Sequence, residues 1–410
     1  MTQRLYYIQP DLLEFDSIVE DIAALAGQEP RHSFTLRESA FYPTSGGQTH
    51  DTGWLTLDNG KRLRVTEVAE SEDGKVVHYF EGDARDLPPG ASVHGSIDSW
   101  RRLDHMQQHS GQHVLSAAFI ELYQMPTVSF HMGEESCSID LATPVIKPEQ
   151  MVTAEKRANE IIFENRPVRI RFVSRSEAEK LGLRKLPPVE WDELRLIEIA
   201  DFDLSACGGT HVAATGQIGC ILLRKTEKVK QGTRVEFVCG GRAVTMARRD
   251  YTALTESAGL FSTQLWEVPA QIGKSFEEAK AYRRERDEAL DQVAEALAAV
   301  ALKEAPETNG RRVIVRLFSD RDIAFAKLFA QKATRAGVPA IALVASTMGA
   351  LGLVFAQSVG GNADMGALLK TVLATAGGRG GGSKDFAQGG VPAGSNVDEL
   401  LKRAAEAVRH

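Results

Sequence analysis

Two short motifs carry side chains that can bind a metal ion together. In HMQQHSGQH, the residues His105, His109 and His113 follow one another at intervals of four. Residues four apart on a helix lie one above the other, so a pair of these imidazoles can bind one cation. In LSACGGTHV, Cys207 and His211 also lie four apart, and the glycines between them let the chain turn sharply. Imidazole nitrogen and thiolate sulfur form a donor set that suits Zn²⁺.

The helical spacing alone does not decide which histidines bind the ion. A step of about 100° per residue places His105, His109 and His113 within about 80° of one another around the helix. A surface or capping role is more common for histidines at this spacing, so the HxxxH pattern is weak evidence by itself. The addition of Cys207 and His211 makes a metal site the stronger prediction.

Other catalytic patterns are missing from the sequence. It contains no Gly-x-Ser-x-Gly elbow, no Walker loop and no Rossmann glycine pattern, which disfavours a serine hydrolase, a nucleoside triphosphatase and a dehydrogenase. A hydrolytic or binding role at the metal remains. The other cysteines have no ligating neighbours, and we expect them to be buried structural side chains: Cys137, Cys220 and Cys239.

Hydrophobic periodicity predicts the elements that position these motifs. Residues 1–98 read as a β-barrel-like domain of short alternating strands separated by Gly, Asp and Asn turns. Ser99–Tyr123, which carries the histidines, has apolar residues at threes and fours and is predicted to be helical. Strands and helices then alternate to about residue 245. The strands predicted in the first domain are Ser33–Leu36, Trp54–Leu57, Leu63–Val68 and Val76–Phe80.

Residues 246–304 are predicted to form a helical linker with a break near Pro269 and Gly273. Its apolar residues from Leu290 to Val300 cover only one or two heptads, so we expect it to pack on its own chain; a dimeric coiled coil is the alternative. Residues 305–410 are predicted to be an α/β domain with a βαβ arrangement. Its predicted strands are Val313–Phe318, Ile341–Val344 and Leu353–Ala356. The fold class is therefore α+β and multidomain.

The charge is unevenly distributed along the chain. The 410 residues carry a net charge of −7, which taken alone argues against a nucleic-acid partner. Residues 305–410, however, hold 13 Lys or Arg against 8 Asp or Glu, a net charge of +5, and leave −12 on residues 1–304. Within this basic domain, AGGRGGGSKDFAQGG surrounds Arg379 and Lys384 with glycines. We expect an ordered loop there that approaches phosphate oxygens; a flexible linker is the alternative.

The sequence also bears on membranes and compartment. The uncharged stretch from Val338 to Val359 is as long as a membrane span, but Pro339 and a polar cluster divide it. We expect two buried strands there and no membrane association. Four cysteines without a CxxC pair, and a start that lacks the pattern of a secretory signal, favour the cytoplasm.

Five motifs, in this order, resemble the long type of the AlaX family, which are freestanding alanyl-tRNA editing proteins related to the editing and C-terminal portions of alanyl-tRNA synthetase. The motifs are FYPTSGGQTHDTG, HSGQHVLSAAF, CGGTHVAATGQIGCILL, GTRVEFVCGGRA and GGRGGGSKDFAQGG. The resemblance covers nearly the whole chain. It implies that residues 1–98 and 99–245 form a zinc-containing editing region, that 305–410 is a tRNA-binding DHHA1-like domain, and that the synthetase's aminoacylation domain has no counterpart here.

The resemblance also implies roles for individual residues. It assigns zinc to His109, His113, Cys207 and His211, and so decides against His105. It implies a substrate pocket lined by Thr44, Ser45, Gly46, Gly47 and Gln48. Synthetase editing domains carry glutamine in the strand after the helix, whereas this sequence has His131, as in the long AlaX type, so His131 is a further pocket candidate. Arg379 and Lys384 are the candidate tRNA-binding residues.

The implied activity is hydrolysis of the ester between serine or glycine and tRNA for alanine. Zinc could activate water or polarise the carbonyl, although four protein ligands would close the site; we therefore hypothesise that His211 is the least tightly bound. One rival is a zinc-stabilised RNA-binding protein without hydrolytic activity. Another is a phosphoesterase, disfavoured because Met106, not a second histidine, follows Asp104-His105. A homodimer through residues 273–303 is left open.

Overall fold

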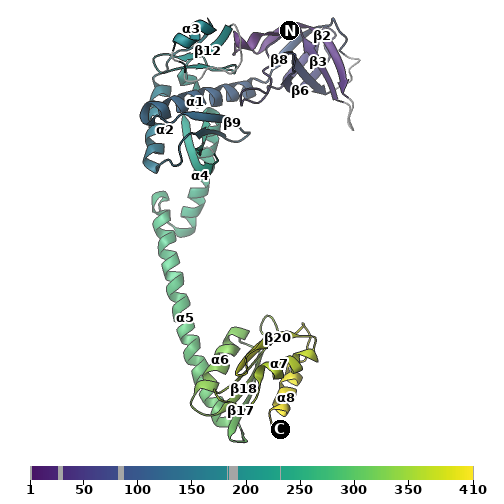
Figure 1. Ribbon diagram of the computed structural model, residues 1–410, viewed down its shortest axis with the longest axis vertical. Helices are drawn as coiled ribbons and strands as arrows, with labels where there is room; N and C mark the ends of the chain where they lie inside the picture. The colour runs from purple at the N-terminus through teal and green to yellow at the C-terminus, as the bar shows by residue number, and fades with distance from the viewer. Residues whose placement is uncertain are drawn as a thin grey trace. The chain divides into compact units, whose positions relative to one another are not determined.

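The computed structural model describes residues 2–25, 31–81, 87–181, 183, 193–230 and 232–409. They form two compact units, Met1–Glu256 and Ser257–His410 (Figure 1). Both units mix helices and strands, which confirms an α+β, multidomain chain. The predicted boundaries inside each unit, near residues 98, 245 and 304, stay predictions.

The N-terminal part of the first unit is a closed barrel of six antiparallel strands in the order β2-β3-β7-β6-β5-β8. Side chains alternate between the barrel interior and solvent, as the period of two predicts, and the interior holds residues such as Phe34, Leu55 and Val65. The predicted barrel is therefore confirmed. The strands are β2 (Glu14–Leu25), β3 (Arg31–Leu36), β5 (Gly53–Leu57), β6 (Arg62–Glu70), β7 (Val76–Glu81) and β8 (Ser92–Ile97); β1 (Gln3–Arg4), η1 (Leu5–Tyr7) and β4 (Glu38–Ser39) lie beside them.

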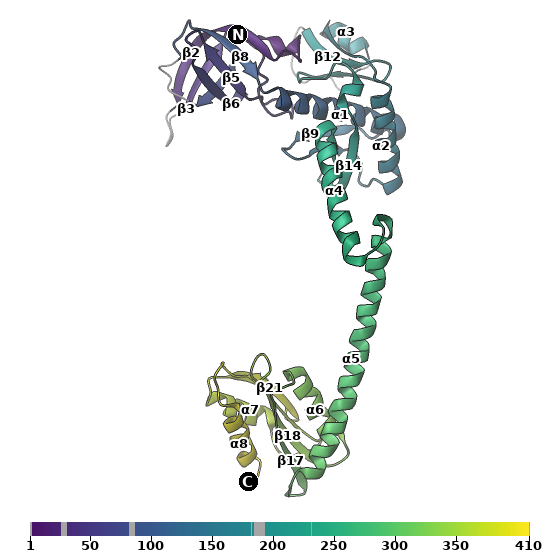
Figure 2. The same ribbon diagram turned by 180° about the vertical axis from the view of Figure 1, so that it is seen from behind.

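The histidine motif lies on α1 (Ser99–Tyr123), whose limits are those predicted. One face of α1 packs with α2 on the four-stranded sheet β14-β15-β10-β9, in a core that includes Leu115, Phe119 and Phe237. A second sheet, β11-β12-β13, leads to the cysteine motif. Figure 2 shows α1 crossing between the barrel and these elements. The elements are α2 (Pro148–Phe163), α3 (Arg175–Lys180), η3 (Thr215–Ile218), β9 (Thr127–Met132), β10 (Cys137–Leu141), β11 (Val168–Ser174), β12 (Glu193–Ile199), β13 (Asp203–Ala206), β14 (Ile221–Val229) and β15 (Gly232–Cys239).

Two long helices follow, α4 (Gly240–Phe261) and α5 (Val268–Glu304), joined through η4 (Leu265–Glu267). The predicted break near Pro269 and Gly273 is wrong in position. Pro269 lies in the first turn of α5, where its missing N–H costs nothing, and Gly273 lies inside the helix. The C-terminal part of α5 packs on α6 through Ala294 and Ala298, as expected for a helix that packs on its own chain. Val300, by contrast, is 51% exposed.

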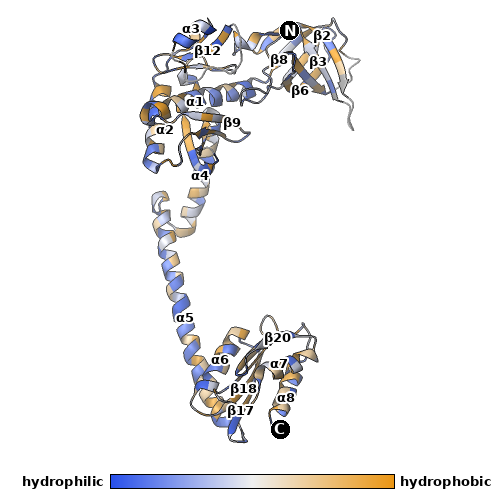
Figure 3. Ribbon diagram, viewed as in Figure 1, coloured by the Kyte–Doolittle hydropathy of each residue, from blue (hydrophilic) through white to orange (hydrophobic). Residues whose placement is uncertain are grey.

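The second unit is built on the six-stranded sheet β16-β17-β18-β19-β21-β20. β17 and β18 are parallel and connected by α6, which confirms the βαβ arrangement. The uncharged stretch forms β18 and β19, both buried along their whole length, as predicted. In Figure 3, hydrophilic residues predominate along α5. None of the described helices is long and apolar enough to span a membrane. The elements are β16 (Glu307–Thr308), β17 (Arg311–Phe318), α6 (Ile323–Arg335), β18 (Ala340–Ser346), β19 (Gly352–Gln357), α7 (Met365–Ala374), β20 (Arg379–Gly382), β21 (Phe386–Gly390) and α8 (Val397–Ala407).

The glycine-rich segment is a pair of strands, not the loop that we expected. β20 and β21 pair antiparallel, and β21 also pairs with β19. A Cβ atom on Gly380 would lie 2.5 Å from the Cα of Gly389 and 2.7 Å from Leu373 Cδ1. Glycine is therefore needed because α7 and the two strands approach one another too closely for side chains.

Candidate metal centre

The structure brings four predicted ligands together. One ligand atom from each of His109, His113, Cys207 and His211 lies within 4.8 Å of the others. The Cys207 Sγ is 3.3 Å from both His109 Nε2 and His211 Nε2. His109 and His113 come from adjacent turns of α1, and Cys207 and His211 come from the turn that follows β13. His105, one turn earlier on α1, is not part of this group.

A buried glutamine orients the first imidazole. Gln48 is 0% exposed, and its Oε1 lies 2.8 Å from His109 Nδ1. The same oxygen accepts the Thr210 backbone N–H at 3.1 Å, and Gln48 Nε2 donates to Thr210 Oγ1 at 2.8 Å. Gln48 thus fixes His109 with its Nε2 toward Cys207, and it ties the SGGQ segment to the CGGTH turn.

The other imidazoles are oriented in the same way. Ser110 Oγ lies 3.2 Å from His211 Nδ1 and accepts the Val212 backbone N–H. His113 Nδ1 lies 3.3 Å from both Asp203 Oδ2 and Ser205 Oγ. Around a bound metal, one nitrogen of a ligating imidazole usually bonds to a neighbouring side chain or carbonyl, which leaves the other nitrogen free for the ion.

The donor set fits a metal ion such as zinc. Zinc bonds of about 2.0–2.3 Å in a tetrahedron separate neighbouring ligand atoms by about 3.3–3.8 Å, close to the sulfur–nitrogen separations seen here. Burial raises the pKa of the Cys207 thiol, but the imidazoles of His109 and His211 outweigh that effect and hold it well below its usual range. A thiolate is the form of cysteine that binds metals.

The SGGQ segment passes beside this centre. Thr44, Ser45, Gly46 and Gly47 are exposed, whereas Gln48 is buried against the histidine. Gly47 has φ +85°, and its carbonyl oxygen accepts the Met132 backbone N–H at 3.2 Å. A Cβ at Gly47 would lie 2.7 Å from the Phe130 carbonyl oxygen, so only glycine fits there.

His131 does not join the centre. Phe130 on β9 stacks on His109 with ring centroids 5.4 Å apart. The next residue of the strand points to the opposite face of the sheet, where His131 Nε2 lies 3.6 Å from Asp140 and 3.3 Å from Ser129 Oγ. Its side chain is 55% exposed.

Sequence reasoning missed several residues of the centre. Ser110, Thr210 and Asp203 were not singled out, although Ser110 and Thr210 lie inside the two motifs. Polar side chains recur at alternate positions along β13 and just beyond its end, at Asp203, Ser205 and Cys207. This spacing predicts that they lie on the same face of the strand. Of the remaining cysteines, Cys137 and Cys239 are buried as expected, whereas Cys220 is half-buried.

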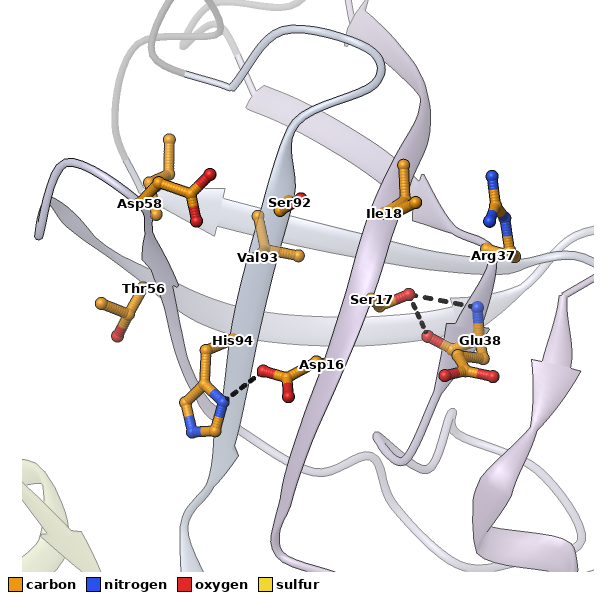
Figure 4. Close-up of a pocket in the computed structure, with 11 residues that line it drawn as sticks. Asp16, Ser17, Ile18, Arg37, Glu38, Thr56, Asp58, Ser92, Val93 and His94 are labelled. Atoms are coloured by element: carbon orange, nitrogen blue, oxygen red, sulfur yellow. Dashed lines mark hydrogen bonds and ion pairs between the residues drawn. The ribbon is translucent and has the colours of Figure 1, made fainter.

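Arg379 and Lys384 lie in the second unit, on β20 and in the turn before β21. Both are exposed, and among the described residues neither forms an ion pair that the structure records. A polar pocket of about 620 Å³ on the barrel involves none of the predicted site residues. Figure 4 shows His94 bonded to Asp16 in this pocket, and Glu14 occupies the other ring nitrogen.

Three family models match the sequence. They describe the threonyl and alanyl tRNA synthetase second additional domain over residues 194–236, class II (A) tRNA synthetases over 14–101 and a DHHA1 domain over 307–410. The first match contains Cys207 and His211, and the second covers the barrel. The predicted absence of an aminoacylation domain stays a prediction.

The similar proteins include alanine–tRNA ligases. The ligase of Archaeoglobus fulgidus is 31% identical over 98% of this chain and 43% of its own length, and that of Natronomonas pharaonis is 33% identical over 100% of this chain and 44% of its own length. The chain thus spans less than half of these relatives. The C-Ala domain from Aquifex aeolicus alanyl-tRNA synthetase is 19% identical, covering 26% of this chain and 99% of that domain, with a TM-score of 0.24.

Together, the barrel, the His/Cys centre and these matches define a protein related to alanyl-tRNA synthetase that carries an editing-type domain. Within that class, the matches agree with the AlaX-like motifs and with a DHHA1 domain at residues 307–410, which confirms the resemblance of the sequence.

Proposed function

We propose that this protein is a zinc-dependent aminoacyl-tRNA deacylase that acts in trans on tRNA for alanine mischarged with serine, and also with glycine. The observation that carries the proposal is the group of three buried imidazoles and one partly buried thiol, each imidazole fixed through its Nδ1, beside the exposed SGGQ segment. His109, His113, Cys207 and His211 would hold the ion. Bound zinc would supply Lewis-acid polarisation or a more acidic water.

The chain's own residues would position the ester. An aminoacyl ester is already activated, so orientation and stabilisation of the oxyanion account for most of the catalysis that is needed. Phe130 and Gly47 bring the SGGQ backbone against the centre, and the segment from Thr44 to Gly47 stays accessible to substrate. These residues would bind the amino acid while Gln48 keeps His109 in place.

Selectivity requires a polar group that recognises the serine hydroxyl. A pocket that admits serine cannot exclude the smaller alanine by size. Alanine must instead bind more weakly, because it leaves a polar group of the pocket without a hydrogen-bond partner. Thr44 and Ser45 are exposed hydroxyl groups beside the centre. Gln48 is buried and already bonds to His109 and Thr210, and His131 faces away, so neither is as well placed for this role.

In the second unit, Arg379 and Lys384 would bind the phosphates of the tRNA backbone. The +5 charge of residues 305–410 would add a long-range attraction to the tRNA backbone that does not depend on the nucleotide sequence. We place the protein in the cytoplasm, where mischarged tRNA arises.

The direct test measures release of labelled serine, glycine and alanine from tRNA for alanine charged with each. We expect release of serine and glycine, slow release of alanine, and loss of activity when a chelator removes the metal. Four protein donors around one ion are also typical of a structural site, and the rival function is an RNA-binding protein stabilised by zinc. Tight tRNA binding without release of any amino acid would support that rival.

A further inference from the structure

A second pocket lies one helical turn from the metal centre. It has a volume of about 880 Å³ and is bounded mainly by α1, by α4 and by the turn after β9. His105 lines it and lies four residues before His109, about 6 Å along the helix axis. The SGGQ segment also reaches it, because Thr44 Oγ1 lies 2.9 Å from His50 Nδ1, and His50 lines the pocket.

The pocket lining combines an exposed aromatic ring with two arginines. Trp100 is 77% exposed at the start of α1. Arg101 donates to the His50 carbonyl oxygen at 2.9 Å, and Arg249 is exposed on α4. Among the described residues, neither arginine has a carboxylate partner that the structure records. Arg242, by contrast, is held by Asp104.

A buried polar atom of a lining residue, His105, has no partner among the described residues. His105 is 2% exposed, its Nε2 lies 3.2 Å from Thr49 Oγ1, and its Nδ1 has no hydrogen-bond partner among the described residues. Buried polar atoms are nearly always paired. This nitrogen has less than 1 Å² of exposed surface, so a ligand in the pocket would reach it only after His105 moves.

We propose that this pocket receives the unpaired 3′-terminal nucleotides of the tRNA, with a base stacked on Trp100 and phosphates bound by Arg101 and Arg249. This inference rests on the proposed function, because an ester held at the metal requires space for the attached nucleotides immediately beside it. Proteins that hold single-stranded RNA combine aromatic platforms with cations in this way. The volume is sufficient for more than one nucleotide-sized group.

Two acidic residues of the pocket allow a test with the opposite sign. Glu134 and Glu135 also line the pocket, from the exposed turn after β9. If the ligand is anionic, their carboxylates repel it. Neutralising them should therefore tighten binding, whereas removing the arginine charges should weaken it.

The experiment measures binding of a labelled single-stranded ACCA oligonucleotide to the full-length protein by fluorescence anisotropy. We expect Trp100→Ala to weaken binding at least about fivefold and Trp100→Phe to retain most of it, since stacking needs only an aromatic face. Arg249→Gln should weaken binding, and Glu134→Gln combined with Glu135→Gln should strengthen it. Trp266→Ala, which removes an equally exposed tryptophan of the second unit, and Arg248→Gln are the matched controls.

Unchanged binding in both Trp100→Ala and Arg249→Gln, in proteins with a normal metal content and unfolding temperature, would overturn the proposal. The assay needs no catalysis, so it separates this inference from the proposed function. If the wild-type protein hydrolyses Ser-tRNA but these variants bind the oligonucleotide normally, only the pocket assignment fails. If no hydrolysis occurs but binding responds as expected, the pocket assignment stands without the deacylase.

Discussion

Gln48 shows how a residue beside the metal ligands can control the centre. Its Oε1 holds His109 Nδ1, so Gln48→Met would leave the imidazole without its acceptor. We expect zinc affinity to fall about 10- to 100-fold, the usual cost of losing such a partner. Competition with a chromophoric chelator would measure the dissociation constant.

The control is Gln48→Glu, which keeps an oxygen acceptor for the same ring nitrogen. It should retain most of the affinity that Gln48→Met loses. Equal zinc affinity in Gln48→Met and the wild-type protein would show that the hydrogen bond has no role in metal binding.

Thr44 tests the origin of selectivity. Thr44 is exposed, and its hydroxyl bonds with His50 alone among the described residues, so it is available to a substrate hydroxyl. Thr44→Val keeps the shape and removes the hydroxyl, and we expect a smaller ratio of the deacylation rates of Ser-tRNA and Ala-tRNA. Thr44→Ser should preserve the ratio. If Thr44→Val leaves both rates unchanged, Thr44 has no part in discrimination.

At the scale of elements, the barrel contains a buried histidine that makes it sensitive to acid. His78 is 0% exposed, stacks on Phe34 and bonds with Ser39, and burial lowers its pKa to about 3. Below about pH 6.5 the unfolded chain binds a proton that the folded barrel does not. Stability is therefore lost as the pH falls from about 6.5 towards 3, by about 1.4 kcal/mol per pH unit.

His78→Gln keeps a hydrogen-bonding side chain but removes the titrating group. Between pH 6.5 and pH 5, we expect the free energy of unfolding of this variant to fall by about 2 kcal/mol less than that of the wild-type barrel. Hydrogen exchange of the barrel amides, compared between the two proteins at each pH, would measure the difference. Parallel pH dependence in the two proteins would contradict the assignment.

The glycine-rich hairpin offers a matched pair of substitutions. A Cβ on Gly380 would collide with Gly389 and Leu373, whereas the nearest described atom to a Cβ on Gly381 would be Lys370 Cε at 3.8 Å. Gly380→Ala should destabilise the second unit by about 1–3 kcal/mol, the usual cost of overpacking. Gly381→Ala should change its stability by less than about 0.5 kcal/mol. Urea unfolding would measure the free energy of unfolding of both variants. Equal values would contradict the packing argument.

For the whole molecule, the separation of charge predicts how tRNA binding responds to salt. If Arg379 and Lys384 bind phosphates, replacing both with glutamine should weaken tRNA binding and reduce the slope of log Kd against log salt concentration by about 1–2. The zinc content should not change, because the centre lies in the other unit. Lys402→Gln with Arg403→Gln, which removes charges from α8 instead, is the control. An unchanged slope would exclude both residues from phosphate contact.

Local periodicity predicted much of the fold. The limits of α1 are those read from its apolar spacing, and the βαβ unit and four barrel strands, β3, β5, β6 and β7, occur where alternation and turns indicate them; β2 was not predicted. These features follow from neighbours within a few residues. The glycine-rich hairpin was missed because its strands are defined by the close approach of α7 and β19, which lie outside the segment.

The sequence by itself determined the chemistry that is available: imidazole and thiol donors at intervals of four, an accessible glycine-rich segment and a basic C-terminal domain. Only the tertiary structure decided how these parts combine. It brings Cys207 to His109 across 98 positions of the chain, buries Gln48 behind the ligands and turns His131 to the far face of its sheet. The physical reason is that the helix and strand periods fix the directions of side chains within one element. Packing between elements then decides which of these side chains come into contact.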